Sequence, residues 1–422
     1  MKEYFLHRLW QWGYYDTLRL TTTDNLPITV IHPGQYHQKQ GPDFFNALLE
    51  IDGQKWAGTV EIHLKSSDWY LHHHETDGHY DNVILHVVWE HDMDVFRSDS
   101  QKIPVLELKH FVAEDTLHRY RKLMEPKSWI YCEEYLDSMD ELTQRQWLDE
   151  LFVERLKLKS EEVYSVLSHS GNDWEAVLFY TLAKSFGLQH NGEQFQKMVT
   201  AVTHQVFQKE SEDLMHLEAL LLGMAGLLSA EFQESYPKQL KAQWQFLQAK
   251  YQISDETTTP VTFYQVRPDN FPTIRLAQLA ALYHNQFPLF QKILLTNDIN
   301  ELRRLFRVKT SAYWDTHYNF DKPIAPKSKG LTDSFKQLLI INSVIPVKFA
   351  YLRWQGIEDE SKLMNWMEQL NPEENKIVSF FRNYKVNAAN ALDSQALIHL
   401  KKNYCDQKRC LDCRFGKKIM SP

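Results

Sequence analysis

Glycine and proline are scarce in this chain, with 14 and 15 residues among 422. Both counts fall below the average usage of about 7% and 5%, so long flexible linkers and disordered tracts are not expected. Cysteine is rarer still, with 4 residues, and three of them lie between Cys405 and Cys413. This distribution excludes the kind of disulfide framework that holds small secreted domains together.

Several signatures of common enzyme classes are missing. The chain has no G-x-G-x-x-G, P-loop or G-x-S-x-G motif, which sets aside Rossmann redox chemistry, ATP hydrolysis and the commonest serine hydrolases. The longest apolar run, Leu217–Ala230, is shorter than the about 20 residues that span a membrane. No apolar signal core follows the N-terminal Met-Lys-Glu. We therefore expect a cytoplasmic protein without a membrane segment.

Charge and length describe an ordinary globular protein. Lys plus Arg number 47 against 55 Asp plus Glu, for a net charge of −8, which argues against a surface that coats nucleic acid on all sides. A basic patch on one part of the surface is still compatible with this net charge. At about 150 residues per domain, the length predicts two or three domains.

The first part of the chain has the pattern of a sheet. A short amphipathic segment, Tyr4–Trp12, is followed by alternating stretches, and Asp52-Gly53 is a hairpin turn signal. Asn82–Trp89 is almost continuously apolar, which is typical of a strand buried on both faces. Strands are predicted at residues 18–20, 28–31, 47–51, 59–65, 82–89 and 105–112.

From about Asp115 the apolar period becomes helical. Asn172-Asp173 stands where a helix N-cap belongs and Gly187 where that helix would end. Helices are predicted at 148–156, 177–187, 217–228, 274–283, 286–295, 301–308, 334–349 and 375–384, with a loop at 323–330. The sequence thus predicts an α+β protein with a small α/β domain (1–114), a large all-helical domain (115–395) and a short Cys-rich tail (396–422).

Histidine is concentrated near the N-terminus, where seven of the 19 lie between residues 63 and 91. On the predicted strand 59–65, successive side chains point to opposite faces, so Glu61, His63 and Lys65 share one face. The residues between them are apolar and suit a core. An acid, an imidazole and an amine in one row are more than a solvated strand needs, although a surface salt-bridge row remains an alternative.

Asp43 precedes Glu61 by one hairpin, which can bring the two side chains together on adjacent strands. Two carboxylates so placed can hold Mg²⁺ or Mn²⁺, which prefer oxygen ligands. Lys65 or His63 would then orient or deprotonate a water molecule as the nucleophile. Asp43, Glu61, His63 and Lys65 are therefore candidate catalytic residues.

This arrangement resembles the metal-binding core of the PD-(D/E)xK nuclease superfamily, in which an Asp on one strand is followed by (D/E)-x-K on the next within an α-β-β-β-α-β unit. The residues that carry the resemblance are Pro42-Asp43 and Glu61-x-His63-x-Lys65. It implies that Asp43, Glu61 and the Ile62 carbonyl bind the metal. The chain departs from the pattern because His63, not a lysine, stands two residues after Glu61.

Most of the chain, including the tail, also resembles a bacterial family of unknown function. The shared signature appears as Gly41–Phe44, Val60–His63, Ser67–Trp69, His72–His74 and Val83–Val88. This resemblance implies no activity.

Two other interpretations use the same histidines. His63, His72 and His74 offer nitrogen ligands that suit Zn²⁺ or Fe²⁺, and His72-x-His74 resembles part of the cupin metal motif without its glutamate and glycines. Alternatively, His72–His74 form a solvated turn. His86, between Leu85 and Val87, is expected to be a hydrogen-bonded core residue.

The tail holds a second candidate metal site, with Cys405, Cys410 and Cys413 as ligands. Thiolates so closely spaced in a cytoplasmic protein rarely persist without a metal or a redox duty. The fourth ligand is either His399 or Cys132, and the site would hold structural Zn²⁺ or an iron–sulfur cluster. Free thiols are the alternative.

Basic residues surround these cysteines and suit a phosphate backbone. The candidates for nucleic-acid binding are Lys401, Lys402, Lys408, Arg409 and Arg414. The leading hypothesis is a metal-dependent nuclease or phosphodiesterase. The main alternative is a non-catalytic nucleic-acid-binding or scaffold protein with a degenerate nuclease core and a zinc-stapled tail. Oligomeric state is not predicted.

Overall fold

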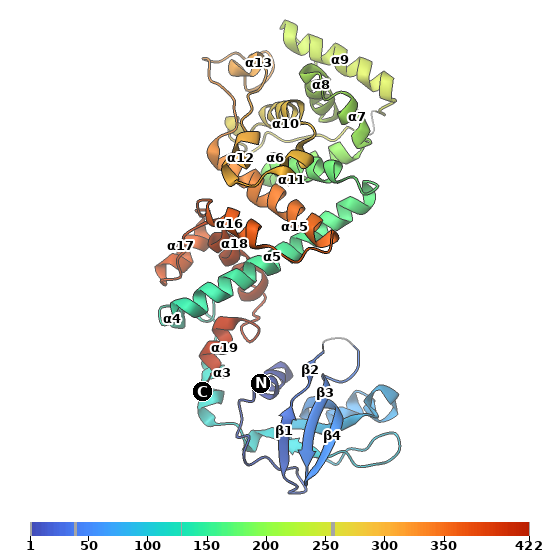
Figure 1. The fold of residues 1–422 in the computed structure, drawn as a ribbon, viewed down its shortest axis with the longest axis vertical. Helices are drawn as coiled ribbons and strands as arrows, with labels where there is room; N and C mark the ends of the chain where they lie inside the picture. The colour runs from blue at the N-terminus through green and yellow to red at the C-terminus, as the bar shows by residue number, and fades with distance from the viewer. Residues whose placement is uncertain (1, 38–39, 128, 255–257, 422) are drawn as a thin grey trace. The chain divides into compact units, whose positions relative to one another are not determined.

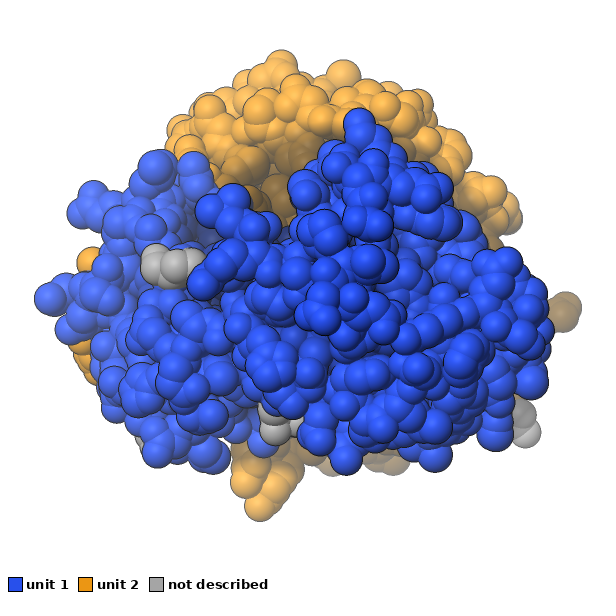
Figure 2. All heavy atoms as spheres, turned by 90° about the horizontal axis from the view of Figure 1, so that it is seen from below, with its two compact units in different colours: residues 1–147, 384–386, 400–422 blue, residues 148–383, 387–399 orange. Residues whose placement is uncertain are grey.

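The computed structural model describes residues 2–37, 40–127, 129–254 and 258–421. The chain forms two compact units, which Figure 2 colours separately. Unit 1 comprises Met1–Trp147, Tyr384–Val386 and Leu400–Pro422, and unit 2 comprises Leu148–Asn383 and Asn387–His399. The Cys-rich tail, predicted to be a separate segment, belongs to the same unit as the N-terminal sheet.

Unit 1 is built on one mixed sheet whose strands run in the order β1-β3-β4-β5-β6, with β2 paired to β3. Figure 1 labels β1 to β4 of this sheet. The β1, β3 and β4 strands form an antiparallel meander, whereas β5 is parallel to β4 and β6 is parallel to β5. The strands are β1 Ile28–His32, β2 Gln35–Tyr36, β3 Phe44–Ile51, β4 Gln54–Lys65, β5 Val83–Glu90 and β6 Val105–Glu107.

Local sequence explains the centre of this sheet. Asp52 and Gly53 have φ of 51° and 77°, which lets two residues reverse the chain between β3 and β4 as predicted. Where β4 meets β5, Gly58 has no side chain to hold the strands apart. A Cβ at this position would lie 2.5 Å from the Ile84 side chain and 2.6 Å from the Asn82 carbonyl oxygen.

Two strand predictions are wrong: one predicted strand is absent, and another ends earlier than predicted. Residues 18–20 form no strand, because the Asp16 side chain accepts a hydrogen bond from the Leu18 N–H (3.1 Å) and turns the chain, leaving Leu18 94% exposed. The last strand ends at Glu107 instead of reaching residue 112. Its pairing with β5 stops there, and a 3₁₀ turn follows at Leu108–His110.

The helix α1 (Glu3–Trp12) packs on β4 through its apolar face, which buries Phe5, Leu6, Leu9 and Trp10. A short helical crossover joins β4 to the parallel strand β5. It consists of α2 Asp68–Leu71, η1 His74–Thr76 and η2 Gly78–Tyr80. The other helices of unit 1 are α3 Glu114–Leu123, α4 Glu133–Leu136, the π-turn η7 Lys401–Cys405 and α19 Arg414–Met420. The long helix α5 (Glu141–His169) begins in unit 1 and continues in unit 2.

The described part of unit 2 is helical. Its first complete helix, α6 (Trp174–Thr200), begins as predicted, since the Asp173 side chain accepts hydrogen bonds from the N–H groups of Glu175 and Ala176. The helix is interrupted at Leu188 (φ 55°, ψ −153°), one residue after the predicted end, and then continues. The remaining helices are α7 His204–Lys209, α8 Leu214–Met224, α9 Ser235–Tyr251, α10 Pro272–Gln286, α11 Leu289–Leu295, α12 Ile299–Leu305, α13 Ala312–Asp315, α14 Asp333–Leu339, α15 Ile345–Trp354, α16 Ser361–Glu368, α17 Lys376–Asn383 and α18 Ala391–Leu400.

The segment from α14 to α15 is continuous through a π-turn at Ile340–Val344. Among the described residues, this Asp333–Trp354 helix is the one whose length and composition would suffice to cross a membrane. It is weak evidence for a membrane span, because 67% of its apolar window is buried, as in the core helix of a globular unit. The α+β class, with a mixed N-terminal sheet followed by a helical region and C-terminal cysteines, is confirmed.

Candidate metal centre

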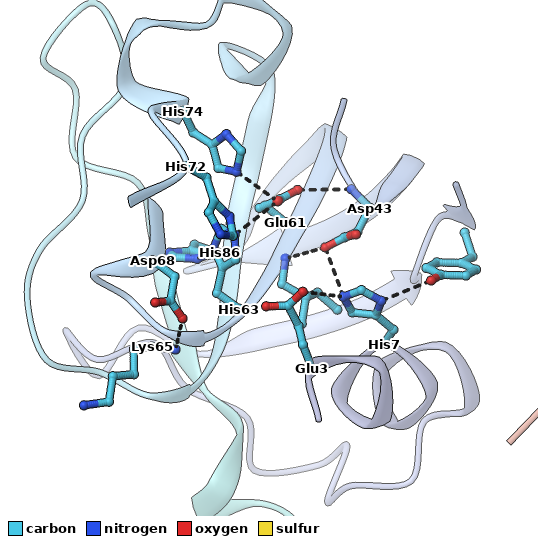
Figure 3. Close-up of polar contacts among 12 residues, drawn as sticks. Glu3, His7, Asp43, Glu61, His63, Lys65, Asp68, His72, His74 and His86 are labelled. Atoms are coloured by element: carbon cyan, nitrogen blue, oxygen red, sulfur yellow. Dashed lines mark hydrogen bonds and ion pairs between the residues drawn. The ribbon is translucent and has the colours of Figure 1, made fainter. Parts of the chain in front are cut away.

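Three histidines converge beside Glu61 in unit 1 (Figure 3). His63 projects from β4, His72 follows α2, and His74 begins η1. One ring nitrogen of each histidine lies within 4.8 Å of the other two. The local chain explains this convergence: His73 adopts a left-handed conformation (φ 60°), which turns the backbone so that both its neighbours face His63.

The ligand atoms share one small volume. His63 Nε2 lies 3.1 Å from His72 Nδ1 and 3.5 Å from Glu61 Oε1. His74 Nε2 lies 3.4 Å from the same Glu61 oxygen. Three imidazole nitrogens and one carboxylate oxygen therefore surround a single point, which is the donor set of Zn²⁺ and related transition ions.

Burial sets the protonation states of this cluster. Burial and the neighbouring histidines lower the pKa of His63 to about 2, and burial followed by the charge of His72 lowers the pKa of His74 to about 4. Both rings are therefore neutral near pH 7, the form that binds a metal. Burial, reinforced by the nearby carboxylate of Asp43, raises the pKa of Glu61 well above its usual value.

A second layer of side chains orients the histidines. His63 Nδ1 lies 2.9 Å from Nε2 of His86, which projects from β5 and is fully buried, as expected of a core histidine. The Tyr80 ring stacks on His74 with 3.7 Å between ring centroids. Trp69 packs edge-on against His74 and tilted against His86. These contacts hold the rings in place without occupying the nitrogens that face Glu61.

Asp43 and Glu61 are in contact, but their two carboxylates do not face a common point, as they would if both bound the same ion. The Asp43 N–H donates a hydrogen bond to Glu61 Oε2 (3.1 Å), which leaves Oε1 facing the histidines. Asp43 Oδ2 accepts a hydrogen bond from the Ile62 N–H (3.0 Å) and lies 3.3 Å from His7 Nε2. The Asp43 carboxylate thus faces α1, whereas the free oxygen of Glu61 faces the histidine cluster (Figure 3).

Lys65 is not part of this group. Its side chain is exposed and points away from the histidines, and its backbone N–H donates to Asp68 Oδ2 (3.0 Å) (Figure 3). Lys65 stands four residues beyond Glu61, about 13 Å along an extended strand, so sharing a face does not bring it close. Of the two candidates for serving the water, the structure brings only His63 into the cluster.

Two side chains on α1 that the sequence pattern did not single out, His7 and Glu3, lie beside Asp43. His7 Nε2 lies 3.3 Å from Asp43 and 4.0 Å from Glu3, and His7 Nδ1 lies 3.2 Å from the Tyr36 hydroxyl. Burial raises the pKa of Glu3, opposed by His7. The available signal was the Glu3-x₃-His7 spacing, which places both side chains on one face of an amphipathic helix.

The tail cysteines gather around Cys132. Cys132, Cys405, Cys410 and Cys413 line one cavity together with Tyr131 and Tyr404, all within unit 1. His399, the other candidate fourth ligand, is buried in unit 2, where its Nε2 lies 3.2 Å from Glu154 Oε1. The structure therefore places Cys132, and not His399, beside the three tail cysteines.

The five basic residues predicted to bind nucleic acid have unequal surroundings. Lys401 is buried and pairs with Asp406, Arg409 pairs with Asp412 (3.0 Å), and Arg414 donates to Gln146 (2.7 Å). Lys402 and Lys408 are exposed. Internal contacts thus engage three of the five.

The sheet, the helix α1 and the histidine–carboxylate cluster define an α+β protein with a candidate metal centre between a strand and a helical crossover. The chain belongs to the family described as "Protein of unknown function (DUF2851)", whose model matches residues 3–376. The family resemblance noted in the sequence is thereby confirmed, although the match ends before the Cys-rich tail. No curated protein and no solved structure matched the chain.

Proposed function

We propose that the chain is a metal-dependent hydrolase that cleaves phosphodiesters, with a transition ion bound by His63, His72, His74 and Glu61. The observation that carries the proposal is the convergence of three histidine nitrogens within 4.8 Å of one another, with Glu61 Oε1 3.4–3.5 Å from two of them. Among the described residues, His74 Nε2 is buried and has no hydrogen-bond partner, as an atom reserved for a metal would be.

The donor set favours Zn²⁺ or Fe²⁺ over Mg²⁺ or Mn²⁺. Nitrogen ligands suit the first two ions, whereas Mg²⁺ and Mn²⁺ prefer oxygen ligands, and Mg²⁺ also keeps several waters. A site for Mg²⁺ would need the Asp43 and Glu61 carboxylates to face the same point, but Asp43 Oδ2 is engaged by the Ile62 N–H and His7. We therefore assign Asp43 a supporting role, in which its N–H holds Glu61 in place. We assign the ion to the three histidines and Glu61.

A bound transition ion would acidify a coordinated water molecule and polarise a phosphoryl oxygen. Side chains of the protein would supply the other two requirements, proton transfer and access for substrate. Asp43 and His7 form a pair beside Glu61, in which His7 is buried and Asp43 is partly exposed, placed to accept a proton from water or return one to a leaving group. His72 is exposed, so substrate can approach from its side. The remaining ligands, His63, His74 and Glu61, are buried.

A phosphodiester substrate is supported by the order of the elements. The run α1-β1-β3-β4-α2-β5 corresponds to the α-β-β-β-α-β unit that the resemblance to PD-(D/E)xK nucleases implies, with Asp43 directly before β3 and Glu61 on β4. Replacement of the motif lysine by His63 fits a site that binds its metal through nitrogen.

The test joins metal binding to cleavage. Metal-free protein is titrated with Zn²⁺, Mn²⁺, Fe²⁺ and Mg²⁺ by calorimetry, and each loaded form is assayed on single- and double-stranded DNA and RNA. His72→Ala should weaken transition-metal binding by about tenfold or more and lower cleavage in parallel. His79→Ala is the matched control, because His79 is an exposed histidine of the same crossover that pairs only with Asp77 in the described structure.

Two outcomes would contradict the proposal. Equal transition-metal affinity in His72→Ala and wild type would remove the metal site. Tight metal binding without cleavage of any of the four nucleic-acid substrates would leave a metal site but refute the phosphodiesterase.

A further inference from the structure

The four cysteines of the chain enclose one cavity in unit 1. Cys132 precedes α4, whereas the other three come from the tail, 273 residues further along in the case of Cys405. All four are free of disulfide bonds, and Cys132 and Cys413 are buried. Four soft ligands from two distant segments, facing a common space, form the complete first coordination sphere of a thiolate-bound metal centre.

The spacing of the sulfurs distinguishes between the kinds of centre. A tetrahedral zinc site, with Zn–S distances of about 2.3 Å, brings its sulfurs to about 3.8 Å from one another. Among the described residues, no three cysteine sulfurs lie within 4.8 Å of one another, whereas the histidine triad meets that limit. The cavity between the cysteines has a volume of about 10 Å³, close to what one water-sized sphere requires. A cage that admits a water-sized sphere at its centre holds its sulfurs further from that centre than the about 2.3 Å of a Zn–S bond. It is therefore too wide for one zinc ion.

We propose that Cys132, Cys405, Cys410 and Cys413 bind a [4Fe–4S] cluster. Each thiolate ligates one iron of the cubane, which fills a wider cage than a single ion does. The tight packing of the cysteine loop supports a built site: a Cβ on Gly416 would lie 1.8 Å from the Cys410 carbonyl oxygen, so α19 closes directly over the loop. The aromatic rings of Tyr131 and Tyr404 complete the wall of the cavity.

The cluster would act as a staple within unit 1. The chain leaves unit 1 after Trp147 and returns at its C-terminal end, so the cluster closes a very long loop, and such closure is costly without a cross-link. The stapled tail also contacts α1, where Asp412 pairs with Arg8 and accepts a hydrogen bond from the Tyr4 hydroxyl. Just after α1, the Tyr14 hydroxyl lies 2.9 Å from Ser421 Oγ. Loss of the cluster should therefore loosen the tail from α1.

The first experiment needs no variant. The full-length protein is purified without oxygen, and its iron, acid-labile sulfide and zinc are measured together with its visible absorbance and the electron paramagnetic resonance signal after reduction. We expect about four irons and four sulfides per chain. One zinc per chain without sulfide, or no metal at all, would overturn the proposal.

Variants then test the ligand set. Cys132→Ser and Cys413→Ser should each lose most of the iron and sulfide and make the tail more sensitive to trypsin at Lys417 and Lys418, which are exposed. His399→Gln is the control, since this residue pairs with Glu154 in unit 2, and it should keep its cluster. Loss of iron in His399→Gln with retention in Cys132→Ser would overturn the assignment of the fourth ligand. Because the histidine site is titrated separately, its failure would leave this result unaffected.

Discussion

His86 offers a sharp test of the candidate metal centre, because it contacts no proposed ligand atom that faces the ion. For His63 Nε2 to bind a metal, its proton must sit on Nδ1, and that N–H must donate to His86 Nε2, 2.9 Å away. Replacing His86 with leucine removes the acceptor. The buried Nδ1–H of His63 then has no partner, which disfavours the tautomer that binds metal.

The expected effect is a 10- to 100-fold loss of Zn²⁺ affinity, as for other partners that orient a metal-binding histidine. That range corresponds to about 1.4–2.7 kcal/mol of binding free energy. The change in folding free energy should be smaller, within about 1.5 kcal/mol, because leucine has a similar volume and His86 Nδ1 itself has no hydrogen-bond partner among the described residues. The variant should therefore fold but bind metal weakly.

Competition with a fluorescent chelator measures the affinity, and circular dichroism with urea unfolding checks the fold. His86→Gln, whose amide oxygen can accept the same hydrogen bond, should recover part of the loss. His110→Leu is the matched control, since His110 is an exposed histidine whose side chain is 62% accessible. A folded His86→Leu protein with Zn²⁺ affinity within about twofold of wild type would refute the tautomer argument.

Three further predictions concern stability. Asp173→Ala should lower the free energy of unfolding by about 1 kcal/mol, because it removes the cap that accepts two backbone N–H groups at the start of α6, as urea denaturation would show. Gly58→Ala should cost about 1–3 kcal/mol, since its Cβ would collide with β5, and an unchanged melting temperature would contradict the close approach of the strands. Metal-free protein should lose stability as pH falls below about 6.5, because the lowered pKa values of His63 and His74 mean that the unfolded state binds more protons. The raised pKa of Glu61 opposes this trend, but it is one group against two. Melting temperatures that rise on acidification from pH 7 to 5 would show the sign to be wrong.

Secondary structure was readable from the sequence where local signals were strong. The Asp52-Gly53 turn, the apolar run of β5 and the Asp173 cap each reflect short-range chemistry, and the structure contains them as expected. Two strand predictions failed. Residues 18–20 alternate like a strand, but the Asp16 side chain accepts a hydrogen bond from the Leu18 N–H and turns the chain there. The last strand, β6, ends where its pairing with β5 stops.

The candidate site was predictable as a list of residues but not as an arrangement. The spacing of Glu61 and His63 on one strand face, and the many histidines that follow, single out this region of the chain. Which atoms face one another depended on the crossover, since the turn at His73 brings two histidines back over β4 and leaves Lys65 outside.

Residue chemistry and short-range spacing were sufficient to identify the possible ligands: carboxylates, imidazoles and thiolates near one another in the chain. Contacts between distant segments were decided by the tertiary structure, because they depend on how whole elements pack. His7 reaches Asp43 only because α1 lies against the sheet, and Cys132 meets the tail cysteines only because the chain returns to unit 1 after building unit 2. A linear pattern carries no information about such returns, since many folds can satisfy the same local periodicity.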